Sequence, residues 1–161
     1  MTGIRVRLTG PADIPVIAAL RAQWTGAVAD AGFEGLVRDW LTAEGERRLV
    51  WLASLGDEPA GLASLLEYHR MPRPDRLASC WGYVGNMFVR EDLRNRGIGS
   101  ALLTAIVAEA QARGYQRLVL SPTERAVPFY ARAGFVDADA AARNDRMMIR
   151  VLHDADDDLR V

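Results

Sequence analysis

Two glycines, Gly97 and Gly99, stand where a predicted apolar strand gives way to a predicted helix. Glycine allows the backbone to turn tightly and to approach a ligand closely. The helix that follows begins with unpaired N–H groups and the positive end of its dipole, and both favour a bound anion such as a phosphate. Arg94 and Arg96 add positive charge. The segment therefore predicts an anion site, although an ordinary strand-to-helix turn with surface arginines would contain the same residues.

Two familiar phosphate-binding motifs are excluded. A dinucleotide fingerprint needs a third glycine where this chain has Leu102. A Walker-A loop needs a lysine, as does Schiff-base chemistry, and all 20 basic side chains of this chain are arginine.

Hydrophobic periodicity predicts the elements that position this loop. Strands are expected at 4–8, 49–55, 60–68, 81–90, 116–120, 135–137 and 147–152, and helices at 13–21, 33–42, 100–113 and 121–132. The strands on either side of the 100–113 helix form a βαβ unit and should be parallel neighbours, whereas the hairpins around them should be antiparallel. This order predicts a mixed sheet with helices on both faces.

Length and composition limit the remaining possibilities. With 161 residues and no linker or repeat, we expect one domain spanning 1–161, with a frayed acidic tail at 154–161. The net charge of −1 argues against a nucleic-acid partner, and no apolar run is long enough for a membrane span. The single cysteine, Cys80, favours a cytoplasmic location. No metal is expected, because His69 and His153 have no Cys or His nearby at ligand spacing.

Two motifs in register resemble the GCN5-related N-acetyltransferase (GNAT) superfamily. Arg94-x-x-Gly97-x-Gly99 is similar to its acetyl-coenzyme-A motif, and the run from Ala126 to Phe135 is similar to its Ala-x-x-x-Tyr-x-x-x-Gly-Phe signature. The resemblance implies an α/β (α+β) fold: a mixed, mostly antiparallel central sheet of six or seven strands, flanked by about four helices, with two splayed central parallel strands.

The resemblance also implies acetyl-CoA as acyl donor and residues that hold it. Backbone groups of Phe88 and Val89 would bond the pantetheine arm like an added strand. Thr123 stands where many members have an asparagine that contacts the cofactor, and Ser121 to Glu124 also match a helix capping box. The pyrophosphate would be held by the loop residues Arg94, Asn95, Arg96, Gly97, Ile98, Gly99 and Ser100.

Tyr130 matches the family tyrosine that protonates the departing thiolate of coenzyme A, and it would also contact the cofactor. The general base is open, because the strand positions where many members carry a carboxylate are Gly85 and Asn86. Glu67 and His69 are candidates, and a water chain or an amine of low pKa would make a base unnecessary.

The implied function is acetyl transfer from acetyl-CoA to a primary amine by direct attack, without a covalent enzyme intermediate. The acceptor would be a small-molecule amine or a protein amine. The alternative is a GNAT-fold sensor or pseudo-enzyme that binds acyl-CoA without turnover. A homodimer through the C-terminal strands stays open. Candidate acceptor-site residues are Trp24, Tyr68, Trp81, Tyr83 and Asn86.

Overall fold

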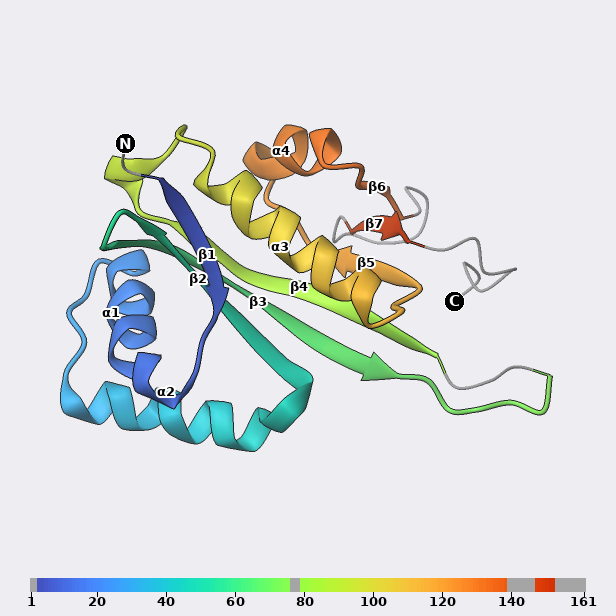
Figure 1. Cartoon of the computed structure of the whole chain (residues 1–161), viewed down its shortest axis with the longest axis horizontal. Coiled ribbons are helices and arrows are strands. Elements are labelled where there is room, and N and C mark those ends of the chain that lie inside the picture. The colour runs from blue at the N-terminus through green and yellow to red at the C-terminus, as the bar shows by residue number, and fades with distance from the viewer. Residues whose placement is uncertain (1–2, 76–78, 139–146, 153–161) are drawn as a thin grey trace. The chain divides into compact units, whose positions relative to one another are not determined.

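The structure is a computed structural model that describes residues 3–75, 79–138 and 147–152. Its α-helices are α1 (Ile14–Trp24), α2 (Ala31–Glu44), α3 (Ile98–Ala112) and α4 (Val127–Arg132). Its strands are β1 (Ile4–Leu8), β2 (Arg48–Leu55), β3 (Glu58–His69), β4 (Cys80–Val89), β5 (Arg117–Leu120), β6 (Val136–Asp137) and β7 (Met148–Val151) (Figure 1).

The strands form a mixed sheet in the order β1-β2-β3-β4-β5-β7-β6. The β1–β2, β2–β3, β5–β7 and β6–β7 pairs are antiparallel. β4 and β5 are parallel, and their register covers two pairs, Gly82 with Leu118 and Tyr83 with Val119. The mixed sheet and its parallel pair confirm the predicted fold class.

Two compact units divide the chain: residues 1–66 with 86–106, and residues 67–85 with 107–161. The boundary passes through β3, β4 and α3, so each of these elements contributes to both units. No described helix has the length and apolar character needed to cross a bilayer.

The first unit has a core between helices and strands. α1 and α2 supply Ile14, Ile17 and Val37, and these pack with strand residues that include Leu62 and Phe88. The middle of β2 is buried on both faces, since four consecutive residues from Val50 to Ala53 are buried. Burial of this kind fixes the strands that carry the candidate site.

The second unit has an aromatic core. Tyr115 and Phe135 are each 1% exposed, and Tyr130 packs edge-on against Phe135 with ring centroids 5.8 Å apart. Gly114, at φ +72°, closes α3 as the sequence predicts, and its neighbour Tyr115 donates its amide hydrogen to the carbonyl of Ala110.

Some predicted boundaries differ from the structure. α1 runs on to Trp24, and α3 begins at Ile98 rather than at Ser100, because Gly97 supplies the turn immediately before it. The expected 121–132 helix is a short 3₁₀ turn at Glu124–Ala126 followed by α4. Its cap position is Thr123, with no side-chain capping bond, so the predicted capping box from Ser121 was wrong. The predicted tail at 154–161 lies outside the described residues.

Candidate active site

The loop before α3 presents a row of unpaired amides. Asn95 (φ 62°) and Gly97 (φ 84°) both have left-handed backbone, which wraps the chain into a concave turn. Within the described residues, the amides of Asn95, Arg96 and Gly97 donate no backbone hydrogen bond. The amides of the first α3 turn, from Ile98 to Ser100, have no partner inside the helix. Such a run of N–H groups at a helix start suits a phosphate.

The arginines around this loop differ in what they already bind. Arg94 donates from Nε to the carbonyl oxygen of Val89 at 3.1 Å, so its side chain ties the loop back to β4. Arg90 is bound to Glu58 and Asp92. Arg96 makes no ion pair with any described residue and is exposed, which leaves its charge available to an anion.

The end of β4 lies tightly against β3. A Cβ placed on Gly61 would be 2.5 Å from the carbonyl oxygen of Phe88, so only glycine fits there. The Phe88 ring stacks on Trp24 at 5.4 Å. Phe88, Trp24 and Arg94 also line a cavity of 510 Å³. Three residues that the sequence assigned to the cofactor or acceptor therefore line one hollow.

Tyr130 is a buried phenol whose hydroxyl has no hydrogen-bond partner in the described part of the chain. It is 7% exposed, and its hydroxyl makes no hydrogen bond among the described residues. Burial, with the nearby Tyr83, raises the pKa of Tyr130 to about 12. The group therefore stays protonated at neutral pH and can donate. Because buried polar groups are nearly always paired, an unpaired one indicates a ligand or water partner.

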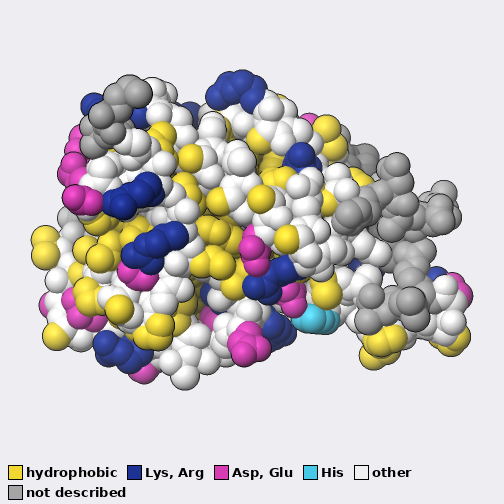
Figure 2. Space-filling model, in the orientation of Figure 1, with side chains coloured by type: hydrophobic (Ala, Val, Ile, Leu, Met, Phe, Trp, Pro, Cys, Tyr) yellow, Lys and Arg dark blue, Asp and Glu magenta, His cyan; other side chains and the backbone are white. Residues whose placement is uncertain are grey.

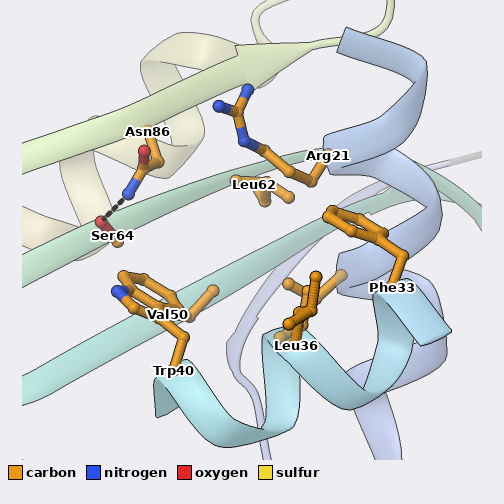
Figure 3. A pocket seen from close by; sticks show the side chains of 10 residues that line it. Arg21, Phe33, Leu36, Trp40, Val50, Leu62, Ser64 and Asn86 are labelled. Carbon is orange, nitrogen blue, oxygen red and sulfur yellow. Dashed lines mark hydrogen bonds between the residues drawn. The ribbon is translucent and has the colours of Figure 1, made fainter. Parts of the chain in front are cut away.

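Asn86 lies in the middle of β4 with φ 52°, in the left-handed region that a non-glycine residue rarely adopts. Its Nδ2 donates to Ser64 Oγ at 3.0 Å (Figure 3). Both side chains line a cavity of 330 Å³ that α1 and α2 wall on one side. Strained backbone beside a cavity is typical of functional sites. Asparagine tolerates this backbone better than most residues, but the sequence alone did not indicate it at this position.

Glu67 is heavily engaged. It accepts a hydrogen bond from Tyr115, lies 3.5 Å from Arg113 and pairs with His69 Nε2 at 2.6 Å. Burial acts to raise the pKa of Glu67, but the hydrogen bonds from Tyr115 and His69 and the charge of Arg113 outweigh it, and the net pKa is lowered. A carboxylate held in this way is a weak proton acceptor, which argues against Glu67 as general base.

The structure also brings Cys80 beside these two residues. Cys80 Sγ is 3.5 Å from His69 Nδ1, and one ligand atom from each of Glu67, His69 and Cys80 lies within 4.8 Å of the others. The spacing in the sequence did not indicate this cluster, because His69 and Cys80 are 11 positions apart and meet only in the folded chain. Burial and the charge of Glu67 raise the pKa of the Cys80 thiol, so it is not an activated nucleophile. His153 lies outside the described residues.

The other predicted acceptor residues pack against one another. Tyr68 and Trp81 stack with ring centroids 4.4 Å apart, and the Arg117 guanidinium lies 5.4 Å from the Trp81 ring centre. Tyr83 is half-buried, and Thr123 is exposed. Tyr68, Trp81, Tyr83 and Tyr130 belong to the second unit, whereas Trp24, Asn86 and the anion loop belong to the first.

Comparison with known proteins agrees with the fold and with these motifs. Residues 15–135 match the model of the acetyltransferase (GNAT) family, and the chain belongs to that family. It is 31% identical over 100 residues to glucosamine 6-phosphate N-acetyltransferase 1 of Oryza sativa subsp. japonica, a match that covers 60% of this chain and 58% of the rice protein. The chain thus spans less than two thirds of the length of this relative.

Solved structures agree with the family. A GCN5-related N-acetyltransferase from Ralstonia eutropha aligns with a TM-score of 0.67 and 28% identity, over 88% of this chain and 97% of that one. A predicted acetyltransferase from Clostridium acetobutylicum, crystallised with acetyl-CoA, aligns with a TM-score of 0.69 and 19% identity, over 88% of this chain and 95% of that one. The latter likeness concerns the fold alone.

Proposed function

We propose that this protein is an acetyl-CoA-dependent N-acetyltransferase that transfers an acetyl group to a primary amine by direct attack. The observation that carries the proposal is the Tyr130 hydroxyl, which is buried and unpaired among the described residues. Such a group costs stability unless a ligand or water uses it. A second support is the row of free amides from Asn95 to Ser100, which fits a pyrophosphate.

Each residue has a defined task in this proposal. Acetyl-CoA, when bound, supplies an activated thioester. The loop amides hold its pyrophosphate, and Arg96 adds charge-assisted bonds. The new N–C bond forms as the C–S bond breaks. The attacking amine gives one proton to water, the thiolate takes one from Tyr130, and water returns a proton to the phenolate. The raised pKa of Tyr130 keeps the phenol neutral beforehand.

The pantetheine arm and Arg94 would both donate a hydrogen bond to the same backbone carbonyl. The carbonyl oxygen of Val89, a proposed acceptor for the arm, already accepts a hydrogen bond from Arg94. A carbonyl oxygen has two lone pairs and can accept a second bond. We therefore propose that Arg94 shapes the end of β4, while the amides beyond it bind phosphate.

A second candidate function is cofactor binding without turnover. Among the described residues, no carboxylate or histidine lines the 330 Å³ cavity beside Asn86, and Glu67 accepts a hydrogen bond from Tyr115. On the catalytic proposal, the amine therefore enters neutral and gives one proton to water once it has attacked the thioester.

One experiment separates the two functions. Acetyl-CoA binding is measured by calorimetry, and thiol release is followed with a panel of primary amines that includes glucosamine 6-phosphate and a lysine peptide. Turnover of any amine above the rate of spontaneous hydrolysis supports the transferase. Saturable binding without turnover on the whole panel supports the binding protein, and absence of binding refutes both.

A further inference from the structure

The cavity beside Asn86 is lined mostly by apolar side chains. It has a volume of 330 Å³, at the lower end for small-molecule sites. Figure 3 shows aromatic and aliphatic side chains from α2 facing those of β2 and β3 across it. Its lining comprises Ile17, Arg21, Phe33, Leu36, Val37, Trp40, Val50, Leu62, Ser64 and Asn86. The site therefore favours a compact ligand with an apolar body.

Some of the apolar lining is open to solvent. Leu36 is 65% exposed and Trp40 is 37% exposed, although both are large hydrophobic residues on α2. Figure 2 shows hydrophobic side chains gathered over the α1 and α2 part of the surface, with basic side chains among them. A ligand with an apolar body would cover the exposed parts of Leu36 and Trp40.

The cavity has a polar end on the strands. Asn86 uses Nδ2 to hold Ser64, so its Oδ1 is not engaged in that bond. A carboxamide oxygen accepts an N–H hydrogen bond but does not take the proton. A neutral amine can therefore be oriented at this end of the cavity, on the strand that continues to Phe88.

The cavity also has one available positive charge. Arg21 makes no ion pair among the described residues, and its guanidinium lies 4.6 Å from the Trp24 ring centre. Arg48, over Trp40, is by contrast paired with Glu44 at 2.8 Å. Because none of the lining residues is acidic, an anion at Arg21 would meet no like charge there.

We infer that the acceptor is a compact amine with an apolar or aromatic body and one carboxylate, an inference that rests on the acetyl transfer proposed above. Asn86 Oδ1 accepts a hydrogen bond from the amine and acts as a positioning residue. The body packs against Leu62 and Trp40, and the carboxylate pairs with Arg21. A polyhydroxylated sugar fits this lining poorly, because the apolar walls leave its hydroxyls without partners.

The test compares three acceptors on the intact protein with acetyl-CoA: phenylalanine, 2-phenylethylamine, which lacks the carboxylate, and glucosamine 6-phosphate. We expect kcat/KM to be highest for phenylalanine. Arg21→Gln should lower kcat/KM for phenylalanine by about 10- to 100-fold, mainly by raising KM. It should change kcat/KM for 2-phenylethylamine by less than about 3-fold. Arg38→Gln, on α2 and outside this cavity, is the matched control.

Asn86 is tested through the same kinetics. Asn86→Leu should lower kcat for both aromatic amines alike, and Asn86→Gln should recover part of the loss, as a positioning role requires. A highest kcat/KM for glucosamine 6-phosphate, or an equal effect of Arg21→Gln on the two aromatic amines, would overturn the inference.

Failure of the transferase proposal is distinguished by binding. If no amine is turned over, calorimetry with the coenzyme-A-saturated protein measures phenylalanine directly. If phenylalanine binds and Arg21→Gln weakens that binding, the proposed ligand class stands for a site without turnover. If phenylalanine does not bind, the proposed ligand class is rejected.

Discussion

Replacing Tyr130 by phenylalanine should separate stability from turnover. The tyrosine ring packs edge-on against Phe129 and Phe135, at 4.9 and 5.8 Å between centroids, and a phenylalanine ring can keep both contacts. The hydroxyl has no hydrogen-bond partner among the described residues. Its removal therefore deletes a buried polar group and breaks no hydrogen bond to the described part of the chain.

The two expected effects have opposite signs. Loss of a general acid lowers kcat by roughly 10²- to 10⁴-fold, which is about 3–5 kcal/mol of activation free energy. Loss of an unsatisfied hydroxyl leaves the free energy of unfolding unchanged or raises it by up to about 1–3 kcal/mol. Because the pKa of Tyr130 is about 12, its ionisation should not affect the wild-type rate below about pH 10.

The assay combines thiol release under saturating acetyl-CoA with urea unfolding of the same preparations. Tyr115→Phe is the matched control, because the Tyr115 hydroxyl donates to Glu67 and its loss should destabilise the fold while turnover falls little. Turnover by Tyr130→Phe within about 3-fold of wild type would refute the acid role. A loss of stability larger than in Tyr115→Phe would refute the claim that its hydroxyl is unpaired.

Three further predictions concern backbone and charge. Gly61→Ala should lower the free energy of unfolding by about 1–3 kcal/mol in urea, because its Cβ would meet a β4 carbonyl oxygen at 2.5 Å, whereas Gly35→Ala in α2 should be neutral or stabilising. Gly97→Val, at φ 84°, should weaken acetyl-CoA binding at least 10-fold, as measured by calorimetry. Gly10→Ala, with open space around it, is the control and should leave the affinity unchanged. Equal affinities of the Gly97→Val variant and the wild type would mean that the loop does not bind the cofactor. Hydrogen bonds from an arginine of β1, then from the Gly10 amide, lower the pKa of Asp13 to about 2. Ionised Asp13 therefore contributes fully to the free energy of unfolding above the ordinary carboxyl pKa near 4, and this contribution is lost as pH falls through 2. Asp13→Asn should accordingly reduce the difference between the urea unfolding midpoints at pH 6 and pH 2.5.

Local chemistry made some features predictable from sequence. Gly97 and Gly114 have the positive φ expected of glycines flanking a helix, so the loop and the end of α3 followed from residue type. The parallel placement of β4 and β5 followed from the intervening helix. These features depend on a few neighbouring residues and on general rules of chain connection.

Other features depend on tertiary register and could not be predicted. Asparagine adopts left-handed backbone more readily than other non-glycine residues, but residue type does not tell which asparagine does so, and the contact of Asn86 with Ser64 spans 22 positions. The approach of Cys80 to His69 requires the β3–β4 pairing to be known, because the two are 11 positions apart and joined by a loop. That no described residue makes a hydrogen bond with the Tyr130 hydroxyl can be seen only once the surrounding residues are placed.

The aromatic stack at Trp24 has an optical consequence. Its indole is 5.4 Å from the Phe88 ring and 4.6 Å from the Arg21 guanidinium, and the residue is 40% exposed. Phe88 belongs to the proposed donor site and Arg21 to the proposed acceptor site, so the emission of one fluorophore should respond separately to each ligand. With Trp24→Phe as the blank, titration of the intact protein would report the order in which donor and acceptor bind without a label.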